Sequence, residues 1–277
     1  MTHGRDTGPP EVRGTWNSTL SSEEFAAVRG VGFDPVGQVF GTAVFNRSSW
    51  NSPGQWAGTC GAEWSSSMRV SSSSQTVQSM YAARTLALTR AVAECRTLGG
   101  DGIVGVTLRV GKFPAGGLEF TAWGTAVRAR SRIRPRLPFT SHLSGQDVAK
   151  LMDRGWVPTG LAFGIALATR HDDWRTSRRK AWTAENQEVP AYTRLLHHAR
   201  QDARGRLALE AVKHGGDGVV VEGPELTVSE SECPGIEGAR DLTAEAVFVG
   251  TTIARFRRSE RPAGPGTLTI MRLERER

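Results

Sequence analysis

The chain has 277 residues, of which 38% are hydrophobic and 23% charged, with a formal net charge of +7. This composition is typical of a globular protein, and three cysteines without zinc-type spacing exclude a disulfide scaffold or a structural zinc module. There is no apolar signal segment at the start and no run near ~18 apolar residues. We therefore expect a soluble, cytoplasmic protein with no membrane span.

The sequence resembles itself in its two halves. The pattern Gly-aromatic-x-Pro-x-Gly occurs at 32–37 and again at 155–160, and Gly-Gly-Asp-Gly occurs at 99–102 and 215–218. A Gly-Thr pair follows each Gly-Gly-Asp-Gly run in the same order. The spacing changes only between matched segments, as loop insertions in a duplicated fold would produce. We therefore predict a tandem duplication.

Duplication divides the chain into five segments. They are a disordered N-terminus at 1–15, a first repeat at 16–127, a linker at 128–138, a second repeat at 139–256 and a basic tail at 257–277. The linker has five arginines and two prolines without an apolar period, which predicts an extended, stiff, basic connection. For the arginines of linker and tail we favour solvated, mobile charge. An anionic partner such as nucleic acid or polyphosphate is the alternative.

Each repeat is expected to open with a short helix. Ser21 with Glu24 three residues later is typical of a capping box, and Ser144 with Asp147 repeats the pattern. The remaining elements are strands at 36–45, 103–106 and 120–127 with a helix ending at Gly99, and strands at 159–168, 219–221 and 246–253 with a helix ending at Gly215. The predicted class is α+β, a β-α-β-β two-layer unit in each repeat after the short N-terminal helix. Glycines in the first strands indicate close approach of another backbone.

Spacings of three and four predict an apolar face on each long helix. In repeat 1 this face comprises Tyr81, Leu86, Leu88, Val92, Cys95 and Leu98. In repeat 2 it comprises Tyr192, Leu195, Leu196, Ala199, Ala203, Leu207, Ala211 and Val212.

The Gly-Gly-Asp-Gly runs are interpreted as structural turns. Phosphate loops present amides at a helix N-terminus, whereas these runs follow a helix. Glycine provides the positive φ that a helix C-terminus favours, and the aspartates are expected to bond backbone amides. The turn residues are Gly99, Gly100, Asp101 and Gly102 in repeat 1, and Gly215, Gly216, Asp217 and Gly218 in repeat 2.

The long helix, this turn and the strands after it resemble the YbjQ-like family, whose members are often labelled "putative heavy-metal-binding domain". The matching residues in repeat 1 are Tyr81, Ala91, Glu94, 98–106 and 124–127. Those in repeat 2 are Tyr192, Glu210, 215–221 and 250–251. The resemblance implies two tandem copies of a dodecin-like β-α-β-β subunit. It also implies assembly into rings, usually five-fold.

A soft-metal site needs at least two converging Cys or His side chains. Cys95 lies on a predicted apolar face, which favours a core residue, and the adjacent His197 and His198 point about 100° apart. No ligand set has metal-type spacing, so we predict no cofactor and no stoichiometric transition metal. The weak candidate ligands are His171, Asp172, Asp173, His197, His198, Cys60 and Cys233.

Tryptophans gather in the variable segments of both repeats. An exposed tryptophan in a loop indicates binding or local packing, so these side chains are candidate oligomer contacts, with packing onto their own repeat as the alternative. They are Trp50, Trp56, Trp64, Trp174 and Trp182.

No nucleophile elbow or Walker-type loop occurs in the sequence. We therefore predict a non-enzymatic protein. The family resemblance implies a ring-forming assembly or scaffold protein, a homo-oligomer with five chains as the favoured count. Two alternatives stay open. One is a heavy-metal-binding or metal-sensing protein, and the other binds anions or nucleic acid through the Arg-rich linker and tail.

Overall fold

The computed structural model describes residues 17–46, 67–71, 75–114, 117–132, 134–172, 188–232 and 240–256. The first half contains α1 (Ser22–Gly30), β1 (Phe33–Asn46), β2 (Ser67–Ser71), α3 (Gln75–Thr97), β3 (Gly102–Lys112) and β4 (Gly117–Ala129). The second half contains β5 (Phe139–Thr140), α4 (Gly145–Asp153), β6 (Trp156–Asp172), α6 (Pro190–Lys213), β7 (Gly218–Val221), β8 (Glu225–Glu232) and β9 (Arg240–Arg255). The predicted α+β class is therefore confirmed.

The described strands form two sheets, one mainly from each half. Sheet A has the order β1-β4-β3-β5, and sheet B has the order β2-β6-β9-β7 with β8 also paired to β9. Two short strands cross between the halves: β2 pairs with β6, and β5 pairs in parallel with β3. The sequence analysis missed both crossings, because β2 and β5 are only five and two residues long.

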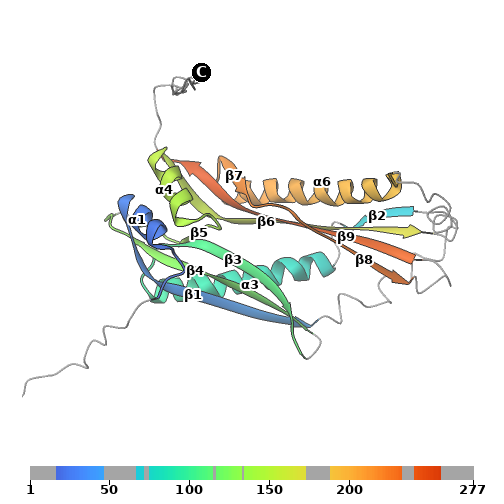
Figure 1. The fold of residues 1–277 in the computed structure, drawn as a ribbon, viewed down its shortest axis with the longest axis horizontal. Coiled ribbons are helices and arrows are strands. Elements are labelled where there is room, and N and C mark those ends of the chain that lie inside the picture. The colour runs from blue at the N-terminus through green and yellow to red at the C-terminus, as the bar shows by residue number, and fades with distance from the viewer. Residues whose placement is uncertain are drawn as a thin grey trace, which may run out of the picture.

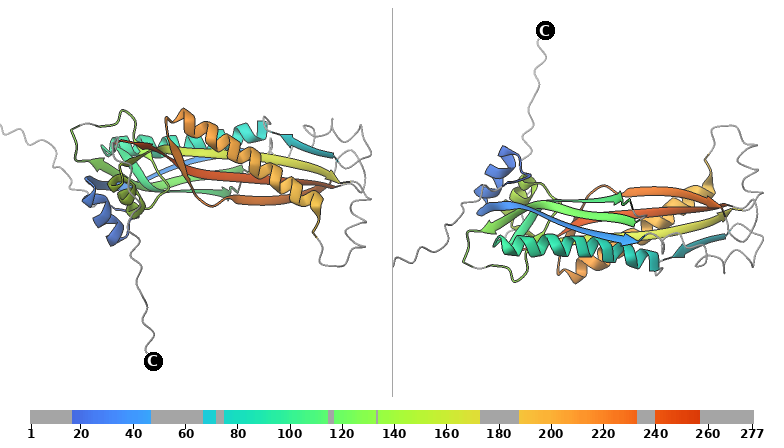
Figure 2. Two further views of the ribbon diagram at one scale, coloured as in Figure 1. Left: turned by 90° about the horizontal axis from the view of Figure 1, so that it is seen from above. Right: turned by 90° about the horizontal axis from the view of Figure 1, so that it is seen from below.

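The helices and sheets are stacked in layers. In Figure 1, α6 runs along the upper side of sheet B, and α3 lies below sheet B and against sheet A. The view from above shows α6 crossing the strands of sheet B at an angle (Figure 2). One hydrophobic cluster joins α3 to both sheets, so the core is shared between the halves. None of the helices in the described residues is long and apolar enough to cross a membrane.

Glycines allow each long helix to lie directly on its sheet. A Cβ atom at Gly41 would overlap the Ala87 carbonyl oxygen of α3, and one at Gly164 would overlap the Ala203 carbonyl oxygen of α6. The expected close backbone approach is confirmed. It also explains why alanine dominates the buried side of each helix, since larger side chains would push the helix away.

The predicted helix faces are partly wrong for the same reason. Cys95 is buried as expected, but Leu86 and Leu98 are exposed, and so is Val212 on α6. The buried stripe of α3 includes Val77, Met80, Ala83, Ala87, Ala91 and Cys95. Large apolar residues dominated the pattern read from the sequence, although small residues make the closest contact.

The Gly-Gly-Asp-Gly turns have the predicted structure in both halves. Gly99 has φ +69° and Gly215 has φ +68°, two residues after α3 and α6 end. The Asp101 carboxylate accepts the Ala129 N–H at 2.8 Å, and the Asp217 carboxylate accepts the Arg255 N–H at 2.9 Å. These aspartates hold the last strand of each half beside the turn.

The short helices are capped nearly as predicted. Ser21 and Glu24 form a complete capping box on α1. On α4 the Ser144 hydroxyl accepts the Asp147 N–H and donates to the Asp147 carboxylate, so the reciprocal bond of a box is replaced by a side-chain pair.

Part of the segment at 128–138 contacts the first half. β4 continues to Ala129, and the Arg128 guanidinium donates to the Gly99 carbonyl at 2.8 Å. Arg130 forms two hydrogen bonds with Asp34, and Arg134 lies 3.8 Å from Asp101. These contacts hold the start of the connection against the first half.

Candidate functional site

The contact between the halves is formed by α3 and the inner face of sheet B. We define that face by its side chains directed away from α6: Leu161, Phe163, Ile165, Leu167, Glu245, Val247 and Val249. Tyr81 of α3 reaches the uncovered edge of β6, where its hydroxyl accepts the Ile165 N–H at 2.9 Å and donates to the Phe163 carbonyl at 3.3 Å. A helix side chain thus takes the place of a neighbouring strand.

A charged pair lies in the same contact. Arg84 of α3 is buried with its guanidinium over the Phe120 ring, and it attracts the Glu245 carboxylate of sheet B. Burial raises the pKa of the Glu245 carboxyl, and the charge of Arg84 opposes that rise. A buried arginine beside a carboxylate fixes the position of two surfaces more than it adds stability.

Each long helix also bonds the edge of its own first strand. Glu94 of α3 accepts the Phe40 N–H at 2.6 Å, and Glu210 of α6 accepts the Phe163 N–H at 2.9 Å. Arg90 donates to the Thr42 carbonyl next to the first of these bonds. The sequence identified Glu94 and Glu210 only as matched residues. In the structure both accept a backbone N–H from the first strand of their own half.

A buried threonine holds the segment before each short helix. In the first half, Thr125 Oγ1 accepts the Thr19 N–H at 3.0 Å. In the second half, Thr251 Oγ1 accepts the His142 N–H at 3.1 Å and lies 2.7 Å from Nδ1 of the same histidine. Burial lowers the pKa of His142, and nearby Asp147 partly offsets this. The Gly-Thr pairs in the sequence therefore mark an anchoring site.

The segment before α4 makes an additional contact that joins the two halves. Ser141 donates its N–H to the Ile103 carbonyl at 2.9 Å, beyond the paired residues of β5 and β3. Val106 of β3 donates back to the Ser141 carbonyl at 2.8 Å. Ile103 is fully buried in consequence.

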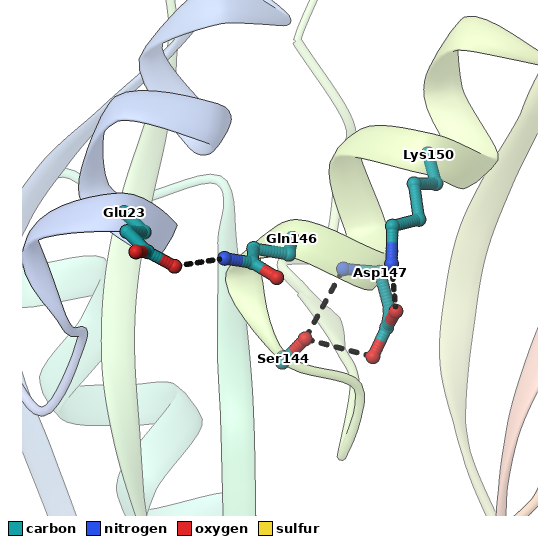
Figure 3. A network of polar contacts seen from close by, with 5 residues as sticks. All are labelled: Glu23, Ser144, Gln146, Asp147 and Lys150. Carbon is teal, nitrogen blue, oxygen red and sulfur yellow. Dashed lines mark hydrogen bonds and ion pairs between the residues drawn. The ribbon is translucent and has the colours of Figure 1, made fainter.

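The short helices meet across an open groove of about 460 Å³. Figure 3 shows Gln146 of α4 donating to Glu23 of α1, beside the Ser144–Asp147–Lys150 contacts of α4. The groove is lined by Glu23, Ala27, Gly30, Val31, Gln146, Ala149, Lys150 and Asp153. This lining lacks histidine, cysteine and serine, so it offers no Ser–His or Cys–His pair.

The second face of sheet A has no helix over it in the described parts of the chain. Seen from below, its strands lie in front (Figure 2). Phe40 and Val44 are about half exposed there, at 50% and 48%, and Arg109 stacks on Trp123 at 5.1 Å. This open face is defined by Phe40, Thr42, Val44, Glu119, Thr121 and Trp123. Exposed apolar side chains such as Phe40 and Val44 on a sheet face are typical of a protein contact surface.

The candidate metal ligands do not converge among the described residues. His171 Nδ1 lies 2.7 Å from the Asp241 carboxylate across β6 and β9, and His197 bonds Gln201 on its own helix. Asp172 lies in β6, and His198 lies in α6 beside His197. Asp173, Cys60 and Cys233 lie outside the described residues. No group of three His, Cys, Asp or Glu side chains suited to a metal ion occurs within the described ranges.

Cys95 is a core residue, as predicted. Its Sγ lies 3.5 Å from the Gly102 carbonyl, and burial raises the pKa of the thiol to about 11. A protonated, enclosed thiol is a poor metal ligand and a poor nucleophile. The five candidate contact tryptophans lie outside the described residues.

The comparisons with known proteins give one family model and one relative. Residues 65–130 match the YbjQ_1 model, described as "Putative heavy-metal-binding". The chain is 33% identical over 215 residues to the encapsulin nanocompartment protein Rv1762c of Mycobacterium tuberculosis (strain ATCC 25618 / H37Rv). That alignment covers 74% of this chain and 76% of the relative.

The family description implies a heavy metal, and the described residues do not fit one. Soft metals need converging thiolates or imidazoles. Within the matched segment the described cysteine is Cys95, whose Sγ is enclosed and protonated. The most compact candidate pair, His171 with Asp241, lies outside the matched segment and is already satisfied by its mutual hydrogen bond.

Proposed function

The chain belongs to the family of the encapsulin nanocompartment protein Rv1762c and carries the YbjQ-like region of that family, and from this premise we propose that it is a non-enzymatic protein whose function is self-assembly into a ring. The open face of sheet A carries this proposal. The half-exposed Phe40 and Val44, beside the partly buried Trp123, need a cover on this sheet face, and the chain has no helix to place there within its described residues.

The proposed ring is built from two similar units per chain, which we attribute to tandem duplication. Both halves have a short helix, a long first strand, a long helix and then further strands in one order, two in the first half and three in the second. Both first strands have a register shift at the same point, between Pro35 and Gly37 and between Pro158 and Gly160. The units extend over 16–127 and 139–256.

The relative's name supports an assembly role. Rv1762c is named as a protein of an encapsulin nanocompartment, which is itself a protein assembly. We propose the same setting for this chain, as a structural component and not a catalyst. The family resemblance favours five chains per ring, and the Trp-containing segments 47–66 and 173–187 are proposed as additional contacts.

Mass measurement at micromolar concentration tests the proposal. Five chains of 30.0 kDa give about 150 kDa, and native mass spectrometry resolves this from other counts. A stable species of another closed count keeps the ring and changes its size. A single 30.0 kDa species across the concentration range contradicts self-assembly.

A further inference from the structure

The contact between the halves is head-to-tail. The first half contributes the side of α3 that faces away from sheet A, together with the outer edge of β3, and the second half contributes the inner face of sheet B with β5. Because these are two different surfaces, each half still has one of them uncovered within the described residues. The uncovered surfaces are the outer side of α6 with the edge of β7, and the open face of sheet A with residues 17–20.

We propose that α6 and β7 of one copy bind the open face of sheet A and residues 17–20 of a second copy, repeating the contact that α3 and β3 make inside the chain. This proposal rests on the proposed function of self-assembly and names its interface. Such a contact leaves α6 and β7 free at one end and the open face of sheet A free at the other, so further copies can add until a ring closes.

The two helices can be matched residue by residue. Aligned at their Gly-Gly-Asp-Gly turns, α3 and α6 place Arg200 where Arg84 lies and Arg204 where Leu88 lies. Arg84 is buried by sheet B and Leu88 is half-buried, whereas Arg200 and Arg204 are exposed. The outer side of α6 is thus the exposed counterpart of a buried surface.

The proposed contact contains one opposite-charge pair. Glu119 follows the same pattern in β4 as Glu245 does in β9, five residues before the Gly-Thr pair. Inside the chain Arg84 attracts Glu245, so the matched contact brings Arg200 to Glu119 of a second copy. Glu119 lies on the open face, where the Thr42 hydroxyl donates to its carboxylate at 3.1 Å. An arginine and a carboxylate both left at the surface are suited to that pairing.

The apolar contacts match in the same way. Phe163 and Leu167 on the inner face of sheet B are 2% and 6% exposed because α3 covers them. Their counterparts on the open face of sheet A are Phe40 and Val44, whose exposed fractions are 50% and 48%. A second copy of α6 would cover these two side chains as α3 covers Phe163 and Leu167.

Residues 17–20 of the first half are held in the same way as the second-half segment that pairs with β3. Ser18 bonds Thr125 and the Leu20 N–H as Ser141 bonds Thr251 and the Leu143 N–H, so the two segments are held alike. The Ser141 N–H donates to the Ile103 carbonyl of β3. In the proposed contact, the corresponding hydrogen bond runs from the Ser18 N–H to the Val219 carbonyl of a second copy, at the edge of β7.

Charge reversal with sedimentation velocity tests this interface. Arg200→Glu and Glu119→Arg are each expected to raise the concentration of half-assembly by about tenfold or more, because each places like charges together. The variant with both changes restores an opposite-charge pair and is expected to return within about threefold of the unchanged chain. Arg194→Glu is the matched control, because its counterpart Gln78 on α3 is exposed.

The outcomes separate this interface from the proposed function. If the unchanged chain assembles but Arg200→Glu assembles equally well, or the double variant is no better than the single ones, the interface is wrong and self-assembly stands. If the unchanged chain is monomeric, both proposals are overturned. Should Glu119→Arg fail to fold for loss of its bond to Thr42, Arg200→Glu alone decides, since its side chain is exposed.

Discussion

Gly41 and Gly164 set the distance between each long helix and its sheet. The Ala87 and Ala203 carbonyl oxygens occupy the space that a side chain would need. We expect Gly41→Ala and Gly164→Ala each to lower the free energy of unfolding by about 3 kcal/mol through overpacking, measured by urea denaturation. Gly111→Ala is the control, because no atom lies within 4 Å of its added Cβ, and it should be neutral or slightly stabilising.

His142 makes the stability depend on pH. Burial lowers its pKa, so the folded chain keeps the ring neutral at pH values where the unfolded chain binds a proton. Stability is therefore expected to fall as pH decreases below about 6.5, the ordinary histidine value. Thr19 holds the matching position and bonds Thr125 with a hydroxyl that does not titrate.

His142→Thr is accordingly expected to keep the anchor and to reduce the pH dependence. The measurement compares the urea midpoints of both proteins at pH 7 and pH 5. The difference between the two pH values should be smaller in the variant. An equal difference in both proteins would show that other groups cause the acid sensitivity.

At the scale of elements, side chains of the long helices replace missing strand neighbours. Tyr81 bonds β6 at Phe163 and Ile165, and Glu210 bonds the Phe163 N–H. An exposed sheet edge otherwise invites pairing with another chain. These bonds therefore direct association away from this part of the edge of β6.

Tyr81→Phe removes one of these partners and leaves the shape of the ring side chain. The loss should lower the free energy of unfolding by about 1–2 kcal/mol, because the Ile165 N–H loses its acceptor. Hydrogen exchange gives a local readout: protection of the Ile165 amide should drop, while the Phe163 amide keeps Glu210 and serves as the internal control. Unchanged protection at Ile165 would contradict the role given to Tyr81.

The element types were predictable from the sequence, and their partners were not. Local signals such as the Ser21–Glu24 box and glycine after each long helix correctly indicated where helices begin and end. The strands β1 and β6 extend beyond the predicted 36–45 and 159–168, because pairing with β4 and β9 adds residues without strong local preference. The shared core could not be predicted. A helix that contacts two sheets has buried residues on more than one face, so its sequence shows no single hydrophobic period.

The candidate site likewise depends on contacts that the sequence does not reveal. Exposure of Phe40 and Val44 could not be read from the sequence, because their alternation resembles that of the buried Phe163 and Leu167. Only the structure shows that α3 covers one pair and no described helix covers the other. Trp123 also lies on the open face, with Arg109 stacked on its ring.

At the scale of the whole molecule, the candidate metal ligands do not converge among the described residues. We predict no stoichiometric transition metal in protein purified without a tag. Elemental analysis of the assembled species should find below about 0.1 metal ion per chain, since the described residues contain no group of three ligands to hold one. About one zinc or copper per chain, lost on substitution of His171 or Cys233, would contradict this.

Phe40 and Phe163 should separate assembly from folding, because they hold matched places on the two sheets, and α3 covers Phe163 whereas no described helix covers Phe40. Phe163→Ala is expected to cost about 3–5 kcal/mol of folding free energy, since its side chain is 2% exposed within one chain. Phe40→Ala should change folding by less than about 0.5 kcal/mol, because the side chain is half exposed in the single chain. The same variant should raise the concentration of half-assembly by about tenfold, as a buried aromatic contact between copies would. Urea denaturation at nanomolar concentration and light scattering at micromolar concentration measure the two effects, and a Phe40→Ala protein that assembles normally would exclude the open face of sheet A as a contact surface.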